Sequence, residues 1–338
     1  MSDRESKTVV IADYDFDDVD VERRIVEGAG FRLAAAQSKT EEETIKVARD
    51  AAAIVTQHAR ITAGVIEALT RCEVIARYGT GVDIVDVDAA TKHHILVTNL
   101  PNDWCEGEVA DHALSLMLQV ARKIAVYDRA TRDGVWRRQT GRPIHRLQGA
   151  TMGLHSFGAI AQAVARRGTA FGMRAIAHDP FQDPTVIAEH GAISVSFDDL
   201  VEQSDVLFVQ APLTPQTRGL FDESVLRRMK PTSILINTAR GPIVTDRALH
   251  RALSEGWIAG AGVDDIEEEP AKVAGWKPTS PLFKLDNIVI TPHSAYYSEE
   301  SIHFMRDFAA REVVRVLSGE APLSPVNGWQ LANAGPDA

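Results

Sequence analysis

The sequence has few of the features that mark secreted, membrane-spanning or nucleic-acid-binding proteins. Its two cysteines, Cys72 and Cys105, cannot form a disulfide framework, and so few are typical of a reducing compartment. No apolar run approaches the roughly 20 residues that cross a membrane, and the first residues are too polar for a signal peptide. The formal net charge of −11 argues against nucleic acid as the main partner. We therefore expect a cytoplasmic protein without membrane or nucleic-acid partners.

The residues that are present suffice for two large cores. The chain has 338 residues, about two domains by length, and 45% of them are hydrophobic. Strand-like and helix-like segments alternate along the chain, which predicts βαβ units and an α/β fold with doubly wound parallel sheets. The predicted strands are residues 7–12, 51–56, 73–77, 95–98, 151–157, 173–178, 205–210, 233–236, 258–263 and 287–290. The predicted helices are residues 20–29, 106–132, 160–171 and 298–317, and the Arg-, Gly- and Pro-rich residues 134–149 resemble a crossing between domains.

Arg240, Glu269 and His293 each lie shortly after one of the last three predicted strands. The carboxyl ends of parallel strands meet at the edge where open α/β sheets hold their ligands, so we expect these residues to lie close together. An arginine can bind a carboxylate, and a histidine beside a glutamate can move a proton. Each residue also has a plainer interpretation, as a structural ion pair, part of a solvated acidic turn, or a capping histidine. Each plain interpretation is plausible alone, but it is much less expected that all three hold together at consecutive strand ends.

A cofactor loop is predicted where the strand that begins at Thr151 leads into the next helix. A dinucleotide-binding turn has Gly-x-Gly-x-x-Gly there, and this chain has Ser156, Gly158 and Ala161 at the three positions. The middle glycine lets the backbone approach a pyrophosphate, whereas Ser156 costs about 1 kcal/mol if its φ is positive. Asp179 follows about 20 residues later, where a carboxylate takes the ribose hydroxyls of NAD and repels the 2′-phosphate of NADP. The loop and Asp179 together predict NAD, although Asp179 also fits an ordinary turn.

The histidines do not indicate a metal site. His155 lies in an apolar strand and is interpreted as a core histidine with a satisfied ring nitrogen. His93, His94, His112 and His145 lack the spacing of metal ligands and are expected on the surface or in packing contacts. We therefore predict no bound metal.

Several motifs together resemble one family. They are residues 76–83, the helix start at 108–112 and the three strand-end motifs around Arg240, Glu269 and His293. On these residues, most of the chain resembles the D-isomer-specific 2-hydroxyacid dehydrogenases. Two further stretches, residues 149–153 and 292–298, look most like the C-terminal binding protein and phosphoglycerate dehydrogenase-like branch of that family.

The resemblance implies a fold, an activity and an assembly. The fold would be a flavodoxin-like substrate domain, residues 1–105 plus 293–338, with a Rossmann-type NAD-binding domain, residues 106–292, inserted into it. The activity would be NAD-dependent interconversion of a D-2-hydroxy acid and its 2-oxo acid, in a homodimer formed through the NAD-binding domain. The alternative is an NAD(H)-sensing dimeric scaffold of the corepressor type, which the intact Arg, Glu and His set favours less.

The resemblance also implies roles for single residues. Arg240 would hold the substrate carboxylate, His293 would exchange a proton with the 2-oxygen, and Glu269 would orient the imidazole and favour its charged form. Asp264 would contact the nicotinamide carboxamide. The expected cofactor contacts are Thr80, Val109, Ser156, Phe157, Gly158, Ala159, Ile160, Asp179, Ala211, Pro212, Thr217, Thr238, Ala239, Arg240, Asp264, His293 and Ala295. The expected substrate contacts are Arg77, Tyr78, the backbone amides of Gly79, Thr80 and Gly81, and the side chains of Arg240, His293 and Tyr296.

Two positions bear on which 2-hydroxy acid is used. Phosphoglycerate enzymes of the family tend to carry arginine in the loop where this chain has residues 56–58, Thr-Gln-His. Tyr296 resembles a tryptophan that lies beside the substrate in the C-terminal binding protein branch, and an aromatic side chain there favours an apolar substituent over a phosphate. Arg77 can still meet an extra anionic group, or form an interdomain salt bridge.

Overall fold

The computed structural model describes residues 6–269 and 276–328. These residues form two compact units. The first contains residues 6–104, 276 and 298–328, and the second contains residues 105–269 and 277–297. No helix among the described residues is long and apolar enough to cross a membrane.

The first unit is built on a five-stranded parallel sheet with the order β2-β1-β3-β4-β5. This is the flavodoxin-like order, as predicted. The strands are β1 (Thr8–Ile11), β2 (Arg32–Ala35), β3 (Ala53–Thr56), β4 (Val74–Arg77) and β5 (Leu96–Thr98). The helices are α2 (Asp20–Gly28), α3 (Glu41–Ala48), α4 (Ala63–Ala68), α5 (Val87–Lys92) and α13 (Glu299–Leu317).

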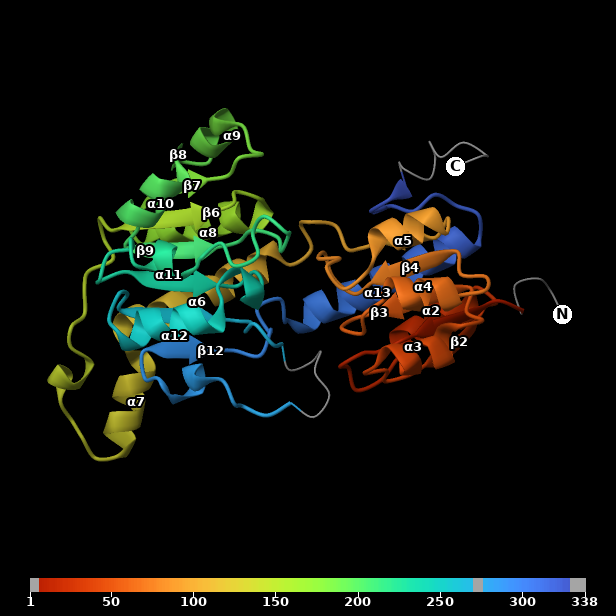
Figure 1. Cartoon of the computed structure of the whole chain (residues 1–338), viewed down its shortest axis with the longest axis horizontal. Helices are drawn as coiled ribbons and strands as arrows, with labels where there is room; N and C mark the ends of the chain where they lie inside the picture. The colour runs from red at the N-terminus through yellow and green to blue at the C-terminus, as the bar shows by residue number, and fades with distance from the viewer. Residues whose placement is uncertain (1–5, 270–275, 329–338) are drawn as a thin grey trace. The chain divides into compact units, whose positions relative to one another are not determined.

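The last helix returns the chain to this first sheet. α13 packs against α2, β3 and β4, and Figure 1 shows it among the red and orange elements of the first unit although it lies near the end of the chain. The second unit is therefore inserted between β5 and α13 along the sequence. This insertion is the arrangement predicted from the sequence.

The second unit contains a seven-stranded parallel sheet with the order β12-β11-β10-β9-β6-β7-β8. The chain reverses its direction across the sheet between β6 and β9, as in a Rossmann fold. In Figure 1 the helices α6 and α8, which pack on each other, lie behind this sheet and α12 lies in front of it. The strands are β6 (Thr151–His155), β7 (Arg174–His178), β8 (Ala192–Ser194), β9 (Val206–Val209), β10 (Ile234–Asn237), β11 (Gly260–Val263) and β12 (Ile288–Ile290). The helices are α6 (Glu106–Arg122), α7 (Ile124–Arg132), α8 (Ala159–Ala170), α9 (Pro184–Glu189), α10 (Phe197–Gln203), α11 (Glu223–Leu226) and α12 (Asp246–Ser254).

Several features differ from the sequence-based expectation, and among them are short helices, such as α3 and α12, that were not predicted. The edge strands β2 and β8 were not predicted, because most of their residues are exposed and they lack a long apolar run. The predicted helix over residues 106–132 is two helices, α6 and α7, since Lys123 adopts a left-handed conformation with φ of 56°. Residues 134–149, which contain the short 3-10 helix Arg138–Gly141, lie within the second unit and are not the crossing between units.

Two glycines of β11 bring α6 close to the second sheet. A Cβ atom on Gly260 would lie 2.6 Å from Val120, and one on Gly262 would lie 2.9 Å from Leu116. These approaches are shorter than real Cβ contacts, so only glycine lets the helix pack here. The apolar face of α6 can then join the buried core of the second unit.

A buried ion-pair network connects α13 to α2 in the first unit. The Arg306 guanidinium donates to both carboxylate oxygens of Glu22, at 2.9 and 2.8 Å, and to Asp18 at 2.8 Å. The Tyr78 hydroxyl also donates to Glu22, at 2.9 Å. Glu22 is 1% exposed, so its charge depends on these donors for stabilisation.

We predict that Arg306→Met will strongly destabilise the protein. Glu22 would keep its buried charge without a cation, which typically costs 3–5 kcal/mol, here about 3 kcal/mol or more in the free energy of unfolding measured with urea. Arg311→Met, on the same helix, is the matched control, because Arg311 pairs with Asp307 at an exposed position and should contribute less than about 0.5 kcal/mol. Equal effects of the two substitutions would contradict the network.

His155, at the end of β6, is a core histidine without a satisfied ring nitrogen. It is 5% exposed and lies among His178, Phe197 and Phe221, with ring centroids 5.3–6.2 Å away. Within the described residues neither ring nitrogen has a hydrogen-bond partner, so this part of the sequence-based interpretation was wrong. Burial, together with the neighbouring His178, lowers the pKa of His155 from 6.5 to about 4.

This lowered pKa predicts a specific sensitivity to acid. The unfolded chain binds the His155 proton more tightly than the folded protein, so this stabilisation is complete above pH 6.5 and is lost as the pH falls toward 4. The loss amounts to about 3 kcal/mol across that range. We expect His155→Phe, which fits the aromatic cluster, to flatten the pH dependence of urea unfolding between pH 6.5 and 4. A variant whose pH dependence matches that of the unmodified protein would contradict the assignment.

Candidate active site

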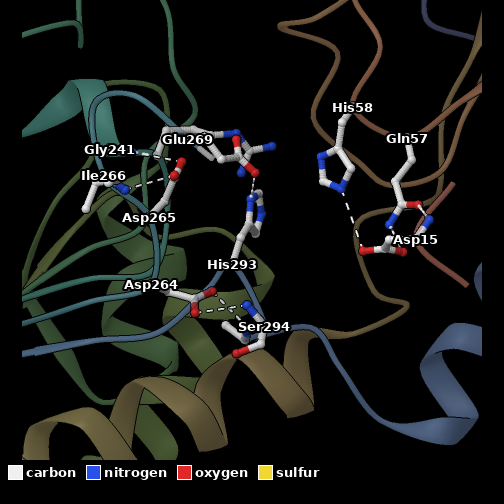
Figure 2. Close-up of polar contacts among 12 residues, drawn as sticks. Asp15, Gln57, His58, Gly241, Asp264, Asp265, Ile266, Glu269, His293 and Ser294 are labelled. Atoms are coloured by element: carbon white, nitrogen blue, oxygen red, sulfur yellow. Dashed lines mark hydrogen bonds and ion pairs between the residues drawn. The ribbon is translucent and has the colours of Figure 1, made fainter. Parts of the chain in front are cut away.

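Glu269 and His293 form a short hydrogen-bonded pair at the carboxyl edge of the second sheet. Nδ1 of His293 lies 2.5 Å from Oε1 of Glu269. Figure 2 shows the two side chains pointing toward each other. The Glu269 side chain is 5% exposed and that of His293 is 18% exposed. The carboxylate at Nδ1 fixes the orientation of the imidazole ring. The Tyr296 ring stands edge-on to the imidazole, with centroids 6.0 Å apart.

Asp264 holds the loop that carries His293. Its carboxylate accepts hydrogen bonds from the amides of Ser294, at 3.0 Å, and Ala295, at 2.8 Å, and from the Thr291 hydroxyl at 2.6 Å. The His293 amide donates to the Asp264 carbonyl at 2.7 Å, in a left-handed conformation with φ of 52°. The structure therefore shows Asp264 anchoring the His293 loop, and the predicted contact with nicotinamide stays a prediction.

His112, on α6, also belongs to this part of the structure. Its Nε2 lies 2.9 Å from the Thr291 hydroxyl and 3.5 Å from Asp264. The interpretation of His112 as a surface or packing residue was therefore incomplete, because it supports the residues that anchor His293. The sequence signal was present, since His112 ends the helix-start motif that supported the family resemblance.

Arg240 follows β10 in a turn that packs against the segment after β11. Its half-buried guanidinium donates to the Ala239 carbonyl at 2.8 Å, and its own carbonyl accepts from the Asn237 side chain at 3.0 Å. A Cβ atom on Gly241 would lie 2.1 Å from the Ile266 backbone, so only glycine allows this approach. The Gly241 amide donates to Asp265 at 3.1 Å. Asp265 was not predicted as a site residue, because the sequence does not show which acids after β11 point inward.

The loop after β6 fits a dinucleotide phosphate. Ser156 has a φ of 75°, so the strain foreseen for a positive φ is present. Gly158 begins α8 without a side-chain cap, and a Cβ atom there would meet nothing within 4 Å, which leaves the first amides of the helix open to an anion. Asp179 accepts from the Phe157 amide at 2.8 Å and from the Ser156 hydroxyl at 3.2 Å. Asp179 therefore stabilises the turn and lies next to it.

The remaining predicted cofactor residues of the second unit lie at the same edge of the sheet. Thr238 and Gln210 exchange side-chain hydrogen bonds that tie the ends of β10 and β9 together, at 2.8 and 3.2 Å. The Thr217 hydroxyl closes the loop after β9 by donating to the Pro212 carbonyl at 2.7 Å. The buried members of the set are Val109, Phe157, Ala211 and Ala295, and Ala159, Ile160, Pro212 and Ala239 are at least partly accessible.

The predicted substrate residues of the first unit follow β4. Arg77 is buried, and its guanidinium donates to the Tyr78 carbonyl at 2.6 Å and lies over Gly79, where φ is 135°. Two predictions need correction. The Tyr78 side chain is 1% exposed and points into the core toward Glu22, and the Gly79 amide donates to the Arg77 carbonyl at 3.0 Å. Neither group is therefore available to a substrate carboxylate in this conformation.

Two neighbouring residues of that loop remain accessible. Thr80 accepts from the Trp104 indole at 2.9 Å and donates to the Pro101 carbonyl at 3.2 Å, which fixes its side chain. Within the described residues, no hydrogen bond involves the amides of Thr80 and Gly81. These two amides are the ones that can still receive a carboxylate.

A second titratable pair, not predicted from the sequence, lies at the carboxyl edge of the first sheet. His58 and Asp15 are 3.7 Å apart, and Gln57 donates to Asp15 at 2.5 Å (Figure 2). Although burial opposes the change, the hydrogen bonds from His58 and Gln57 lower the pKa of Asp15. Asp13 accepts from the amides of Gln57 and His58, which fixes the loop after β3.

One set of three side chains among the described residues could hold a metal ion. Ligand atoms of Asp265, Glu269 and His293 all lie within 4.8 Å of one another. A cation bound there would compete with the Glu269–His293 hydrogen bond, so we assign no metal to this site.

Comparisons with known proteins agree with this geometry. Residues 114–295 match the model of the D-isomer specific 2-hydroxyacid dehydrogenase NAD-binding domain. A glyoxylate reductase of Korarchaeum cryptofilum is 40% identical over 271 residues, which cover 79% of this chain and 80% of that protein. A D-3-phosphoglycerate dehydrogenase of Methanocaldococcus jannaschii is 36% identical over 90% of this chain and 57% of its own length. A solved D-lactate dehydrogenase of Aquifex aeolicus, complexed with NAD and lactic acid, has a TM-score of 0.83 at 26% identity, with 93% of this chain and 96% of that chain covered.

Two parallel-sheet units, one of them with a Rossmann strand order and a match to an NAD-binding domain, are typical of dinucleotide-dependent oxidoreductases. The chain belongs to the D-isomer specific 2-hydroxyacid dehydrogenase family. It is an NAD-dependent enzyme that interconverts a 2-hydroxy acid and its 2-oxo acid. The comparisons do not favour the corepressor-like scaffold as the alternative.

Proposed function

We propose that the protein reduces a small, unphosphorylated 2-oxo acid such as glyoxylate, with Arg240, Glu269 and His293 as catalytic residues. The observation that carries this proposal is the 2.5 Å hydrogen bond between Glu269 and His293 at the carboxyl edge of the NAD-binding sheet. A buried carboxylate on Nδ1 fixes the imidazole so that Nε2 can act on a substrate oxygen.

Each residue has a defined part in the proposed mechanism. The chemistry that NADH would supply, when bound to the second unit, is a hydride for C2 of the 2-oxo acid. Arg240 binds the substrate carboxylate through its planar guanidinium, and His293 gives the Nε2 proton to the 2-oxygen, so that the 2-oxo group gains one hydride and one proton. Glu269 stabilises the positive charge that His293 must carry before this transfer. In the opposite direction, neutral His293 takes the proton back.

Two observations support a small substrate without a phosphate. Several relatives at 38–40% identity, over most of this chain, are named glyoxylate reductases. The loop at 56–58 has no arginine, and Tyr296 places an aromatic ring beside His293, which suits a small or apolar substituent better than a phosphate. We infer that glyoxylate and hydroxypyruvate are reduced well and 3-phosphohydroxypyruvate poorly.

A substrate panel and one substitution test this proposal. With NADH, we expect a specificity constant above roughly 10⁴ M⁻¹s⁻¹ for glyoxylate or another small member of a set that includes pyruvate, hydroxypyruvate, phenylpyruvate and 3-phosphohydroxypyruvate. His293→Ala should lower turnover by roughly 10² to 10⁴, as loss of a general acid does, while substitution of the exposed His303 should have no effect. Near-normal turnover in the His293 variant would remove His293 from catalysis.

We further propose that Asp179 makes the protein prefer NADH over NADPH. Its carboxylate lies beside the phosphate-binding turn, where it repels a 2′-phosphate. Asp179→Asn keeps an oxygen for the Phe157 amide and removes the charge. We therefore expect the ratio of the specificity constants for NADH and NADPH to fall by roughly tenfold, equivalent to about 1.4 kcal/mol. Asp183→Asn is the control, since this exposed residue only caps α9. An unchanged ratio of specificity constants in Asp179→Asn would contradict the proposal.

The roles of the two units and their assembly are also proposals. The first unit would bind the substrate and the second unit would bind NAD in a cytoplasmic homodimer. The units divide after residues 104 and 297, so residues 293–297, expected in the substrate domain, lie in the second unit. The exposed residues after α6 support a dimer through the second unit. Helix α7 has no buried residue and the Trp136 side chain is 87% exposed, and exposed apolar side chains of this kind often mark an interface between proteins. Light scattering in solution tests this, and a monomer at all concentrations would contradict it.

A further inference from the structure

A cavity of about 630 Å³ lies at the amino edge of the second sheet, in the size range of small-molecule sites. Its lining includes residues that directly precede strands, such as Ala150 before β6, Asp205 before β9 and Asn287 before β12. Parallel strands begin at one edge of a sheet and end at the other. The cavity is therefore separate from the proposed active site and from the turn before α8, which both lie at the carboxyl edge.

Three cationic side chains line this cavity without an anionic partner. They belong to Lys123, Arg142 and Arg146. Across residues 6–269 and 276–328, none of these three side chains takes part in a hydrogen bond or an ion pair. Lys123 is half-buried, and burial lowers its pKa with no carboxylate to oppose the effect. A group of uncompensated positive charges in a cavity attracts an anion.

The one carboxylate among the described lining residues does not compensate these charges. It belongs to Asp205, which pairs with Nζ of Lys230 at 2.7 Å and accepts from the Thr151 amide at 2.7 Å. The whole chain has a formal net charge of −11. A positive cavity on such an acidic protein is thus a local feature that its overall composition does not explain.

The remaining walls of the cavity are largely apolar. They include the side chains of Val120, Leu147, Val206, Leu253 and Ile258. Apolar walls with a few charged groups are typical of sites for small organic molecules. Arginine in particular suits a phosphate group, because its planar guanidinium can donate two parallel hydrogen bonds.

A second copy of this chain fits the cavity less well than a small anion does. Residues 134–149 supply much of the lining, and they contain four arginines and no aspartate or glutamate. The same segment of another copy would bring further positive charge to the cavity and no anion.

We propose that this cavity is a second ligand site, which binds an organic phosphate with an apolar or aromatic body. Lys123, Arg142 and Arg146 hold the phosphate, and the apolar body packs against walls that include Val206 and Ile258. The phosphate supplies the negative charge that the three cations lack, and the apolar body removes the exposed walls from water.

Isothermal titration calorimetry on the full chain tests this proposal, with 1-naphthyl phosphate as the probe. Saturating NADH is present throughout, so that the cofactor site is filled. We expect one probe molecule to bind per chain. Inorganic phosphate should bind at least tenfold more weakly, because it has no apolar body to bury. The double substitution Arg142→Gln and Arg146→Gln should weaken binding of the naphthyl probe at least tenfold, as the loss of charge-assisted hydrogen bonds does.

The double substitution Arg137→Gln and Arg138→Gln is the matched control. These two arginines lie in the same segment and are exposed, but they do not line the cavity. The control removes the same amount of charge, so the affinity for the naphthyl probe should stay within about twofold of that of the unmodified protein. All four positions are exposed, so both double variants should keep the urea unfolding transition of the unmodified protein.

Several results would overturn the proposal. One is the absence of binding to the unmodified protein, and another is an affinity that the Arg142 and Arg146 substitutions leave unchanged. Equal weakening in both double variants would indicate only a general attraction of anions to this segment. If the probe does not bind and light scattering shows that the cavity variant alone changes the association state, the cavity is a contact between copies. The titration needs no turnover, so its outcome does not depend on the proposed substrate.

Discussion

The hydrogen bonds that hold β10, β11 and β12 in parallel register are the constraint on which the site depends. The register aligns Asn237 with Val263 and Val263 with Ile290, so the three strands end level with one another. Every residue that follows them starts from one edge of the sheet. Glu269 and His293 can therefore meet although 24 positions separate them along the chain. Each loop that follows one of these strands then has only to bring its side chain over the sheet edge. The buried carboxylates of Asp264 and Asp265 hold these loops by accepting hydrogen bonds from their amides.

The segment after β11 resolves a conflict between burial and charge. Of its acids, Asp264, Asp265 and Glu269 are buried, whereas Glu267 and Glu268 are exposed. A buried carboxylate costs several kcal/mol unless donors or a positive charge compensate it. Here backbone amides compensate Asp264 and Asp265, and the imidazole compensates Glu269. The same contacts that make these charges tolerable also give His293 and Arg240 a fixed place, so stability and chemistry share one set of bonds.

The cofactor loop shows a similar compensation. Ser156 adopts a left-handed conformation that glycine would adopt without strain. Asp179 accepts hydrogen bonds from the Ser156 hydroxyl and from the Phe157 amide, and so holds this turn in place. Each carboxylate oxygen has two lone pairs, so Asp179 keeps acceptor capacity for a further hydroxyl. The serine at position 156, where the pattern has glycine, is thus stabilised by Asp179. Asp179 can still accept a hydrogen bond from a ligand.

The positions of the central strands along the chain, their parallel sheets and the strand ends that Arg240, Glu269 and His293 follow could be predicted from the sequence, because buried parallel strands need apolar runs that are visible in it. The arrangement of the two domains was implied only by the family resemblance. The edge strands β2 and β8 could not, since exposed strands need no such run, and the break at Lys123 has no glycine or proline to mark it. The directions of side chains in the loops were decided only by the tertiary structure. The Asp265 side chain turns inward and accepts a hydrogen bond from the Gly241 amide, which belongs to another loop. The residues around Asp265 in the sequence do not indicate this partner.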